Sequence, residues 1–170
     1  MVRSSLAIPA GCSFREEALA PGDDAHAAGR RLAARVLAEL GDTLAYDGTR
    51  PVAATARARV SIAHSKTRVV VVAGPVARLG VDIVDEVDRA RLARLAPRFL
   101  DAADHAAERF AATEAALKAL GRGLLDGGVF DRACPVTVSL DPPRVTIADD
   151  ELALVLGRLG DSIVAIAYAP

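Results

Sequence analysis

A carboxylate inside a short apolar segment is the feature that most constrains the fold of this chain. Residues 80–84, Gly-Val-Asp-Ile-Val, have the length and β-branched content of a buried strand. Further along, the Ala- and Leu-rich segment 110–120 is typical of a helix, and it carries Glu114 and Lys118 four residues apart on one face. Because a buried carboxylate is costly without a partner or a bound cation, Asp82 is expected to lie beside compensating groups.

The pair Glu114 and Lys118, taken alone, is open to two interpretations. Exposed ion pairs with this spacing are common on helices and stabilise them weakly, so the pair can be an ordinary surface salt bridge. Alternatively, the helix packs against the strand and the two carboxylates and the ammonium group surround one pocket. The presence of both segments in one chain favours this second interpretation over a surface salt bridge.

Composition limits the class of protein. The 170 residues suit one domain, or two small lobes that share a core, and 52% of them are hydrophobic. The formal net charge of -1 argues against a general nucleic-acid binder, so no nucleic-acid partner is expected. No apolar stretch reaches the roughly 18 residues of a membrane span, and no apolar signal core follows the N-terminus. We therefore expect a cytoplasmic protein without a membrane partner.

The two cysteines, Cys12 and Cys134, lie far apart in the sequence. They belong to no Cys-x-x-Cys motif or Cys/His set, which argues against a disulfide framework and against a metal site built on sulfur.

The order of expected elements indicates an α+β fold. An irregular N-terminal segment closes at 21–24, and a helix follows over 24–40, with Asp23 or Asp24 as its N-cap and Gly41 at its end. A group of strands follows this helix. The succession of a helix and strands then occurs a second time, starting with the strand near 79–84. The remaining expected elements are strands at 43–46, 59–63 and 68–73, helices at 88–95 and 101–120, and strands at 136–140, 145–147, 152–156 and 163–167. This repetition predicts two similar lobes, 1–78 and 79–170, with the acidic motifs in the second.

Several motifs in this order resemble the signature of the 4′-phosphopantetheinyl transferases. The family pattern G-[VI]-D-I matches residues 80–83, and [FW]-x-x-K-E-A-x-x-K-A-x-G-x-G matches residues 110–123 apart from one position. Residues 60–65, Val-Ser-Ile-Ala-His-Ser, are similar to the family motif [FV]-[NS]-[IL]-[ST]-H-[ST]. Gly29-Arg30 within the segment 25–35 and Arg50-Pro51 are similar to two further motifs of the two-lobed, surfactin-type branch. The match covers roughly residues 23 to 126.

The resemblance implies a fold of two α+β lobes with coenzyme A in the cleft between them. The implied reaction is Mg²⁺-dependent transfer of 4′-phosphopantetheine to a serine of an apo acyl, peptidyl or aryl carrier protein, as in polyketide or non-ribosomal peptide synthesis. Asp82 and Glu114 would be the metal ligands, because Mg²⁺ takes one or two carboxylates and keeps several waters. Lys118 would reach a phosphate oxygen, and Glu114 or a metal-held water would take the serine proton.

The resemblance also implies a set of phosphate-binding residues. His64 and Ser65 would bind phosphate oxygens of coenzyme A, and Arg30 and Arg50 would serve the nucleotide phosphates. For His64 the alternative is a structural, hydrogen-bonded histidine. For the two arginines the alternative is a solvated side chain.

The chain departs from the family pattern at two positions. Val84 stands where many two-lobed members have a third carboxylate, although Glu86 would share that face if the strand continued beyond a possible turn. Thr113 stands where the family has a lysine, and a Thr113→Lys change would add a cation beside Glu114 if the helix presents position 113 to the cleft.

These departures keep two alternatives open. One is a degenerate member that binds a carrier protein or coenzyme A with little or altered transfer. The other is an unrelated α+β domain in which the acids form structural ion pairs.

Overall fold

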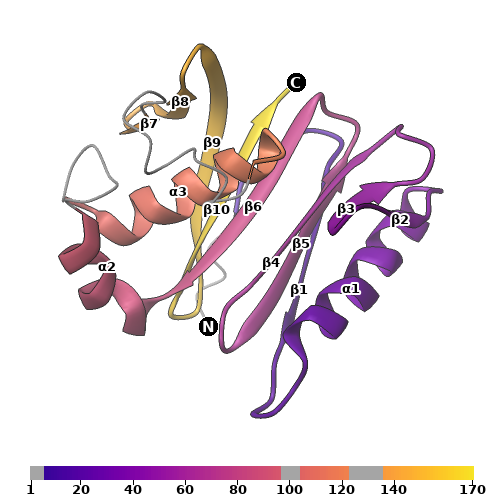
Figure 1. The fold of residues 1–170 in the computed structure, drawn as a ribbon, viewed down its shortest axis with the longest axis horizontal. Coiled ribbons are helices and arrows are strands. Elements are labelled where there is room, and N and C mark those ends of the chain that lie inside the picture. The colour runs from indigo at the N-terminus through magenta and orange to yellow at the C-terminus, as the bar shows by residue number, and fades with distance from the viewer. Residues whose placement is uncertain (1–5, 97–103, 123–135) are drawn as a thin grey trace.

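The computed structural model describes residues 6–96, 104–122 and 136–170, and its described elements form a mixed α+β fold (Figure 1). What we call the N-terminal unit contains β1 (Ser13–Ala18), α1 (Ala25–Glu39), β2 (Leu44–Asp47), β3 (Arg50–Ala53), β4 (Arg59–His64) and β5 (Arg68–Gly74). The C-terminal unit contains β6 (Arg78–Asp85), η1 (Glu86–Asp88), α2 (Arg89–Leu95), α3 (Ala106–Ala119), β7 (Val136–Leu140), β8 (Pro143–Ile147), β9 (Asp150–Leu159) and β10 (Ser162–Ala169).

The strands form separate antiparallel sheets in the two units. In the N-terminal unit the strand order is β1-β5-β4, and β2 and β3 form a hairpin. In the C-terminal unit the order is β6-β10-β9-β8-β7. Figure 1 shows α1 on the outer face of the first sheet and α3 on the outer face of the second. The layers therefore run helix, sheet, sheet, helix.

Strand β5 is buried on both faces, which explains its unbroken run of valines. Val69 and Val71 belong to the core beneath α1, whereas Val70 and Val72 belong to a second core shared by both sheets. This alternation follows from the two-residue period of a strand. The shared core includes Val81 and other apolar residues of β6 and β10, so it joins the two units.

The edge strands β4 and β6 are also linked by a buried polar contact. The backbone N–H of Val81 donates a hydrogen bond of 3.0 Å to the hydroxyl of Ser61 in β4. Since a buried N–H without a partner is costly, Ser61 satisfies a group of β6 that the second sheet leaves unpaired at this edge.

Helix α1 has the caps that its sequence predicts. Asp24 is the N-cap, and its side chain accepts a hydrogen bond of 3.0 Å from the N–H of Ala27. Gly41, with φ +71°, follows the helix in the left-handed conformation that glycine tolerates best. The apolar face that includes Leu32, Val36 and Leu37 is buried against β4 and β5.

The main errors of the sequence analysis lie in the N-terminal unit. The segment before residue 24 is not irregular, because Ser13–Ala18 forms β1 and pairs with β5. The strand β3 was also not predicted. β1 is an edge strand with several polar residues, and β3 is a four-residue strand that contains Pro51, so neither has the apolar pattern used to find the others. The helix predicted over 101–120 begins only at Ala106, after a turn at 104–105. Residues 101–103, the last residue of the motif at 123, and Cys134 lie outside the described residues.

None of the helices within the described ranges is long and apolar enough to cross a bilayer.

Candidate functional site

The centre of the site is an ion pair between β6 and α3. The ammonium Nζ of Lys118 lies 2.8 Å from Oδ1 of Asp82 and also donates a hydrogen bond of 3.2 Å to the carbonyl of Val81. The exposed fractions of the two side chains are 33% for Lys118 and 13% for Asp82. This partly buried pair brings together the two sequence motifs and excludes a lone surface pair on the helix.

Small residues allow α3 to lie close to the strand that carries Asp82. A Cβ atom on Gly80 would collide with the carbonyl oxygen of Ala115 and the backbone nitrogen of Ala119. Opposite Gly80 and Asp82 in β10 stand Ala167 and Ala165. The glycine of the motif is therefore needed for the close approach of helix and strand that sets Lys118 against Asp82.

Glu114 adds a second carboxylate to the group. Burial raises the pKa of Glu114 to about 7, and the nearby charge of Asp82 contributes to the rise, while Lys118 opposes it. Burial likewise raises the pKa of Asp82, which the Lys118 ammonium limits. Two desolvated carboxylates thus share one cation, and the cluster can take up either a proton or another positive charge.

His64 stands at the end of β4 and lines a hollow of about 410 Å³ between the two units. Its ring makes an edge-to-face contact with His26 of α1, with 4.6 Å between the ring centroids. Arg30 and Lys118 line the same hollow. Burial lowers the pKa of His64, and the positive charges of His26 and Lys118 lower it further. The hollow therefore has cationic or hydrogen-bonding groups from both helices.

The sequence analysis missed His26. Its only signal in the sequence is its place two residues after the N-cap of α1, close to the Gly29-Arg30 motif. The side chain is exposed, but it faces His64.

On its other side, His64 borders a more apolar hollow of about 510 Å³. Val84, Leu92 and Phe110 supply apolar surface, and Ser65 lies at its edge. Val84, at the position where many two-lobed family members have a third carboxylate, is thus part of the apolar lining of this hollow.

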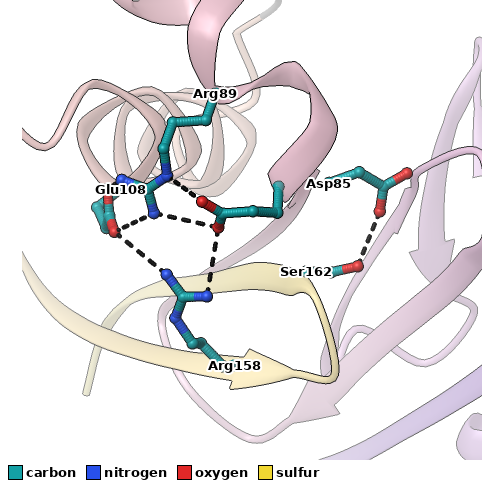
Figure 2. A network of polar contacts seen from close by, with 6 residues as sticks. Asp85, Arg89, Glu108, Arg158 and Ser162 are labelled. Atoms are coloured by element: carbon teal, nitrogen blue, oxygen red, sulfur yellow. Dashed lines mark hydrogen bonds and ion pairs between the residues drawn. The ribbon is translucent and has the colours of Figure 1, made fainter.

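Ser65 is held within the turn that joins β4 and β5. Its hydroxyl accepts a hydrogen bond of 3.2 Å from the N–H of Thr67. The turn is fixed to the C-terminal unit by Asp85, which accepts hydrogen bonds from Lys66 N at 3.2 Å, Thr67 Oγ1 at 3.2 Å and Ser162 Oγ at 2.8 Å (Figure 2). Burial alone would raise the pKa of Asp85, but these hydrogen bonds outweigh it and lower the pKa. Asp85 is therefore a structural anchor next to His64 and Ser65.

The structure separates the two predicted arginines. Arg30 lines the hollow of His26 and His64. Arg50 lines a different hollow with Arg59, Arg78 and Arg122, near the end of α3. The structure thus brings Arg30, but not Arg50, to the His64 hollow.

Thr113 does not face the cleft. It is 1% exposed, and its hydroxyl has no hydrogen-bond partner among the residues that the structure describes. A lysine here would have to bury its ammonium group, so the condition on which the Thr113→Lys change depended, a position 113 that faces the cleft, is not met.

Glu86 does not extend the acidic face of β6. It lies in the turn η1, where it pairs with Arg89 and lies 3.3 Å from Arg158. Arg89 also bonds Glu108 at the start of α3, at 2.9 Å. This network fixes η1 and α2 to α3 and β9. The carboxylate of Glu86 is therefore bound to arginines and does not join Asp82.

The donor set at the centre fits a hard divalent cation. Within the described ranges, no cluster of three or more His, Cys, Asp or Glu residues has the geometry of a metal site. Asp82 and Glu114 are nevertheless two desolvated carboxylates that are electrostatically coupled to each other and to Lys118, and Mg²⁺ typically uses one or two carboxylates plus water. The chemistry of the residues therefore suits Mg²⁺ held by two protein oxygens.

The chain matches no protein-family model, and no curated protein matches it. Its function must therefore be inferred from the motifs and from the site.

Proposed function

We propose that this protein is a Mg²⁺-dependent 4′-phosphopantetheinyl transferase that converts apo carrier proteins to their holo form. The observation that carries the proposal is the Lys118–Asp82 ion pair, with Glu114 electrostatically coupled to it. Three residues from two separate motifs meet there, and His64 from a third motif lies close enough for its pKa to respond to Lys118 and Asp82. The arrangement of two helix-on-sheet units around this site agrees with a two-lobed member of the family.

The two hollows beside His64 suit the two parts of coenzyme A. The hollow of His26, Arg30 and His64 offers donors and positive charge for the nucleotide phosphates. The apolar hollow of Leu92 and Phe110 offers surface for the pantetheine arm and for the incoming carrier protein. His64 lies between the two, where the pyrophosphate would cross.

The reaction joins the serine oxygen of the carrier protein to the β-phosphorus of coenzyme A and releases 3′,5′-bisphosphoadenosine. Asp82 and Glu114 would hold Mg²⁺, which supplies charge neutralisation at the pyrophosphate. Lys118 stabilises negative charge that develops on phosphate oxygens. The proton of the serine hydroxyl would pass to Glu114 or to a metal-held water.

The direct test is incubation with coenzyme A, Mg²⁺ and a panel of apo carrier proteins, followed by intact mass spectrometry. A carrier that gains one phosphopantetheine group supports the proposal. Asp82→Asn should reduce the rate on the order of a hundredfold or more, because it removes a metal ligand and a charge. Glu39→Gln, a change of a distant acid on α1, is the matched control and should leave the rate unchanged.

A second experiment separates the transferase from a binding module. His64→Ala and Arg30→Gln should weaken binding of coenzyme A by calorimetry more than binding of pantetheine, because their proposed partners are phosphate oxygens. If the wild type binds coenzyme A but modifies no carrier in the panel, the transferase proposal is wrong and a binding module takes its place.

A further inference from the structure

A second cationic hollow is lined by other residues than Asp82, Glu114, Lys118 and His64 of the proposed reaction. It has a volume of about 310 Å³, and its lining residues come from the end of α3 and from the starts of β3, β4 and β6. We call it the arginine hollow, and its charged lining residues are Arg50, Arg59, Arg78, Arg122 and Asp150. The arginines come from four separate segments, so the tertiary fold alone assembles them.

Positive charge exceeds negative charge in the arginine hollow. Among the described residues that line it, Asp150 is the one acid, and it pairs with Arg78 at 2.8 Å. Arg59 is oriented by its Nε, which donates a hydrogen bond of 3.1 Å to the carbonyl of Ala77, so that its terminal nitrogens remain available for another acceptor. Guanidinium groups that line one hollow repel one another, and an added anion would relieve this repulsion.

The end of α3 does not need these arginines as caps. Its last turn is closed by the backbone, with Gly121 N donating to Lys118 O at 3.0 Å and Arg122 N donating to Leu117 O at 2.8 Å. Gly121 has φ +70°, and a Cβ on it would collide with the guanidinium of Arg50. The glycine thus closes the helix and leaves room for Arg50 beside it.

We propose that the arginine hollow binds a small phosphate-bearing anion. Arginine presents planar pairs of N–H donors that match phosphate oxygens, and a tetrahedral phosphate can accept from several guanidinium groups at once, whereas a planar carboxylate accepts from fewer. The volume suits a pyrophosphate-sized ligand better than a polypeptide segment. Arg78 precedes Asp82 by four strand residues, roughly 13 Å, so the site is distinct from the Asp82 cluster. The proposal does not depend on the transferase function.

The test is calorimetric titration of the full chain with pyrophosphate, in Mg²⁺-free buffer and without coenzyme A. Arg50→Gln and Arg59→Gln should each weaken the binding about tenfold or more, since each removes a charged donor. Arg94→Gln, an exposed arginine of α2, is the matched control and should not change it. Acetate at equal ionic strength should not bind measurably.

A parallel titration of Arg30→Gln locates the bound anion. Retention of wild-type affinity in Arg30→Gln, together with its loss in Arg50→Gln and Arg59→Gln, supports the arginine hollow. The reverse pattern would put the anion in the hollow of His26 and His64 and overturn the proposal. Pyrophosphate binding no stronger than that of acetate would also overturn it. Thermal unfolding with and without pyrophosphate checks that every variant is folded and that the ligand-dependent rise in Tm follows the same pattern.

Discussion

The two helices α1 and α3 differ in how they present charged side chains. Helix α1 buries one face against β4 and β5, and Arg30, Arg31 and Arg35 on its other side are exposed. Helix α3 is rich in alanine and is buried over most of its surface, so Glu114 and Lys118 are only half-exposed. Helix α1 therefore contributes solvated cations, two of which pair with the partly exposed Glu17, whereas α3 contributes desolvated charges that must compensate one another.

The difference arises from how closely each helix approaches its sheet and from how much of the helix surface is buried. In the N-terminal unit the close approach is made by Gly29 of the helix, where a Cβ would lie 2.8 Å from the Cγ2 of Ile62. In the C-terminal unit it is made by Gly80 of the strand, where a Cβ would meet the helix backbone itself. A side chain can move away from an added methyl group, but a helix backbone can move only as a whole.

The largest expected effect comes from exchanging these two glycines for alanine. Gly80→Ala should destabilise the protein by about 3 kcal/mol or more, because the methyl group forces α3 off the strand. Gly29→Ala should cost about 1 kcal/mol or less, because the clash is with a movable side chain and alanine favours a helix. Urea denaturation of both variants measures the difference. Equal losses of stability would refute the contrast between the units.

Removal of one cation from each unit should give the next largest effect. Lys118→Met leaves two carboxylates without their ammonium and should cost about 2–3 kcal/mol at pH 8. Arg35→Met removes an exposed partner of Glu17, at 2.6 Å, and should cost about 0.5 kcal/mol or less. The comparison is made by urea denaturation at pH 8 and again at pH 5. If the loss in Lys118→Met does not shrink at pH 5, where the carboxylates bind protons more readily, uncompensated charge is not its cause.

The link between the units is tested by Ser61→Ala. This change leaves the buried N–H of Val81 without its hydroxyl partner and should cost about 1–2 kcal/mol. Ser13→Ala in the edge strand β1, which has no such link, is the control and should be close to neutral. Hydrogen exchange should show faster exchange at Val81 in Ser61→Ala; unchanged exchange there would show that the hydroxyl does not protect this amide.

The smallest expected effect is a pH dependence of stability due to Glu114. Its pKa is about 7 in the folded protein and lower in the unfolded chain, so the folded state binds the proton more tightly. The stability from the protonated form is present below the unfolded pKa of about 4.5 and is lost as the pH rises toward 7.

In metal-free protein, Glu114→Gln should therefore be more stable than the wild type at pH 8, by about 1 kcal/mol after allowance for solvent screening, and nearly equal to it at pH 4. Denaturation at several pH values, with Glu39→Gln as the control, measures this. A wild-type curve that stays parallel to the Glu114→Gln curve would contradict the raised pKa.

The sequence predicted elements well where an apolar period was strong. The helix 24–40 and the strands at 59–63, 68–73 and 79–84 are confirmed within one or two residues, and the α+β class is confirmed. The strands β1 and β3 were missed because edge strands carry polar side chains and depend on a partner that the local sequence does not reveal. The two-lobed division at residue 78 stays a prediction.

The motifs indicated which charged residues of β6 and α3 lie together, but not where the other motif residues lie. Asp82 and Lys118 were expected near one another, and they are in contact. His26 was missed, Arg50 proved to lie in the arginine hollow, and Thr113 proved to be buried. The direction of a side chain on a helix depends on which faces are covered, and the Ala-rich sequence of α3 has no clear polar side from which this could be read.

The sequence by itself determined the residue types that can perform phosphate chemistry and the local elements that carry them, because caps, glycines and apolar periods act over a few neighbouring residues. The tertiary structure alone decided which charges meet. It brings Lys118 into contact with Asp82 and raises the pKa of Glu114 by burial. It also places His26 against His64 and brings four arginines together near the end of α3. These outcomes depend on contacts between segments far apart in the chain and on the loss of water around them, and neither is encoded in any single stretch of sequence.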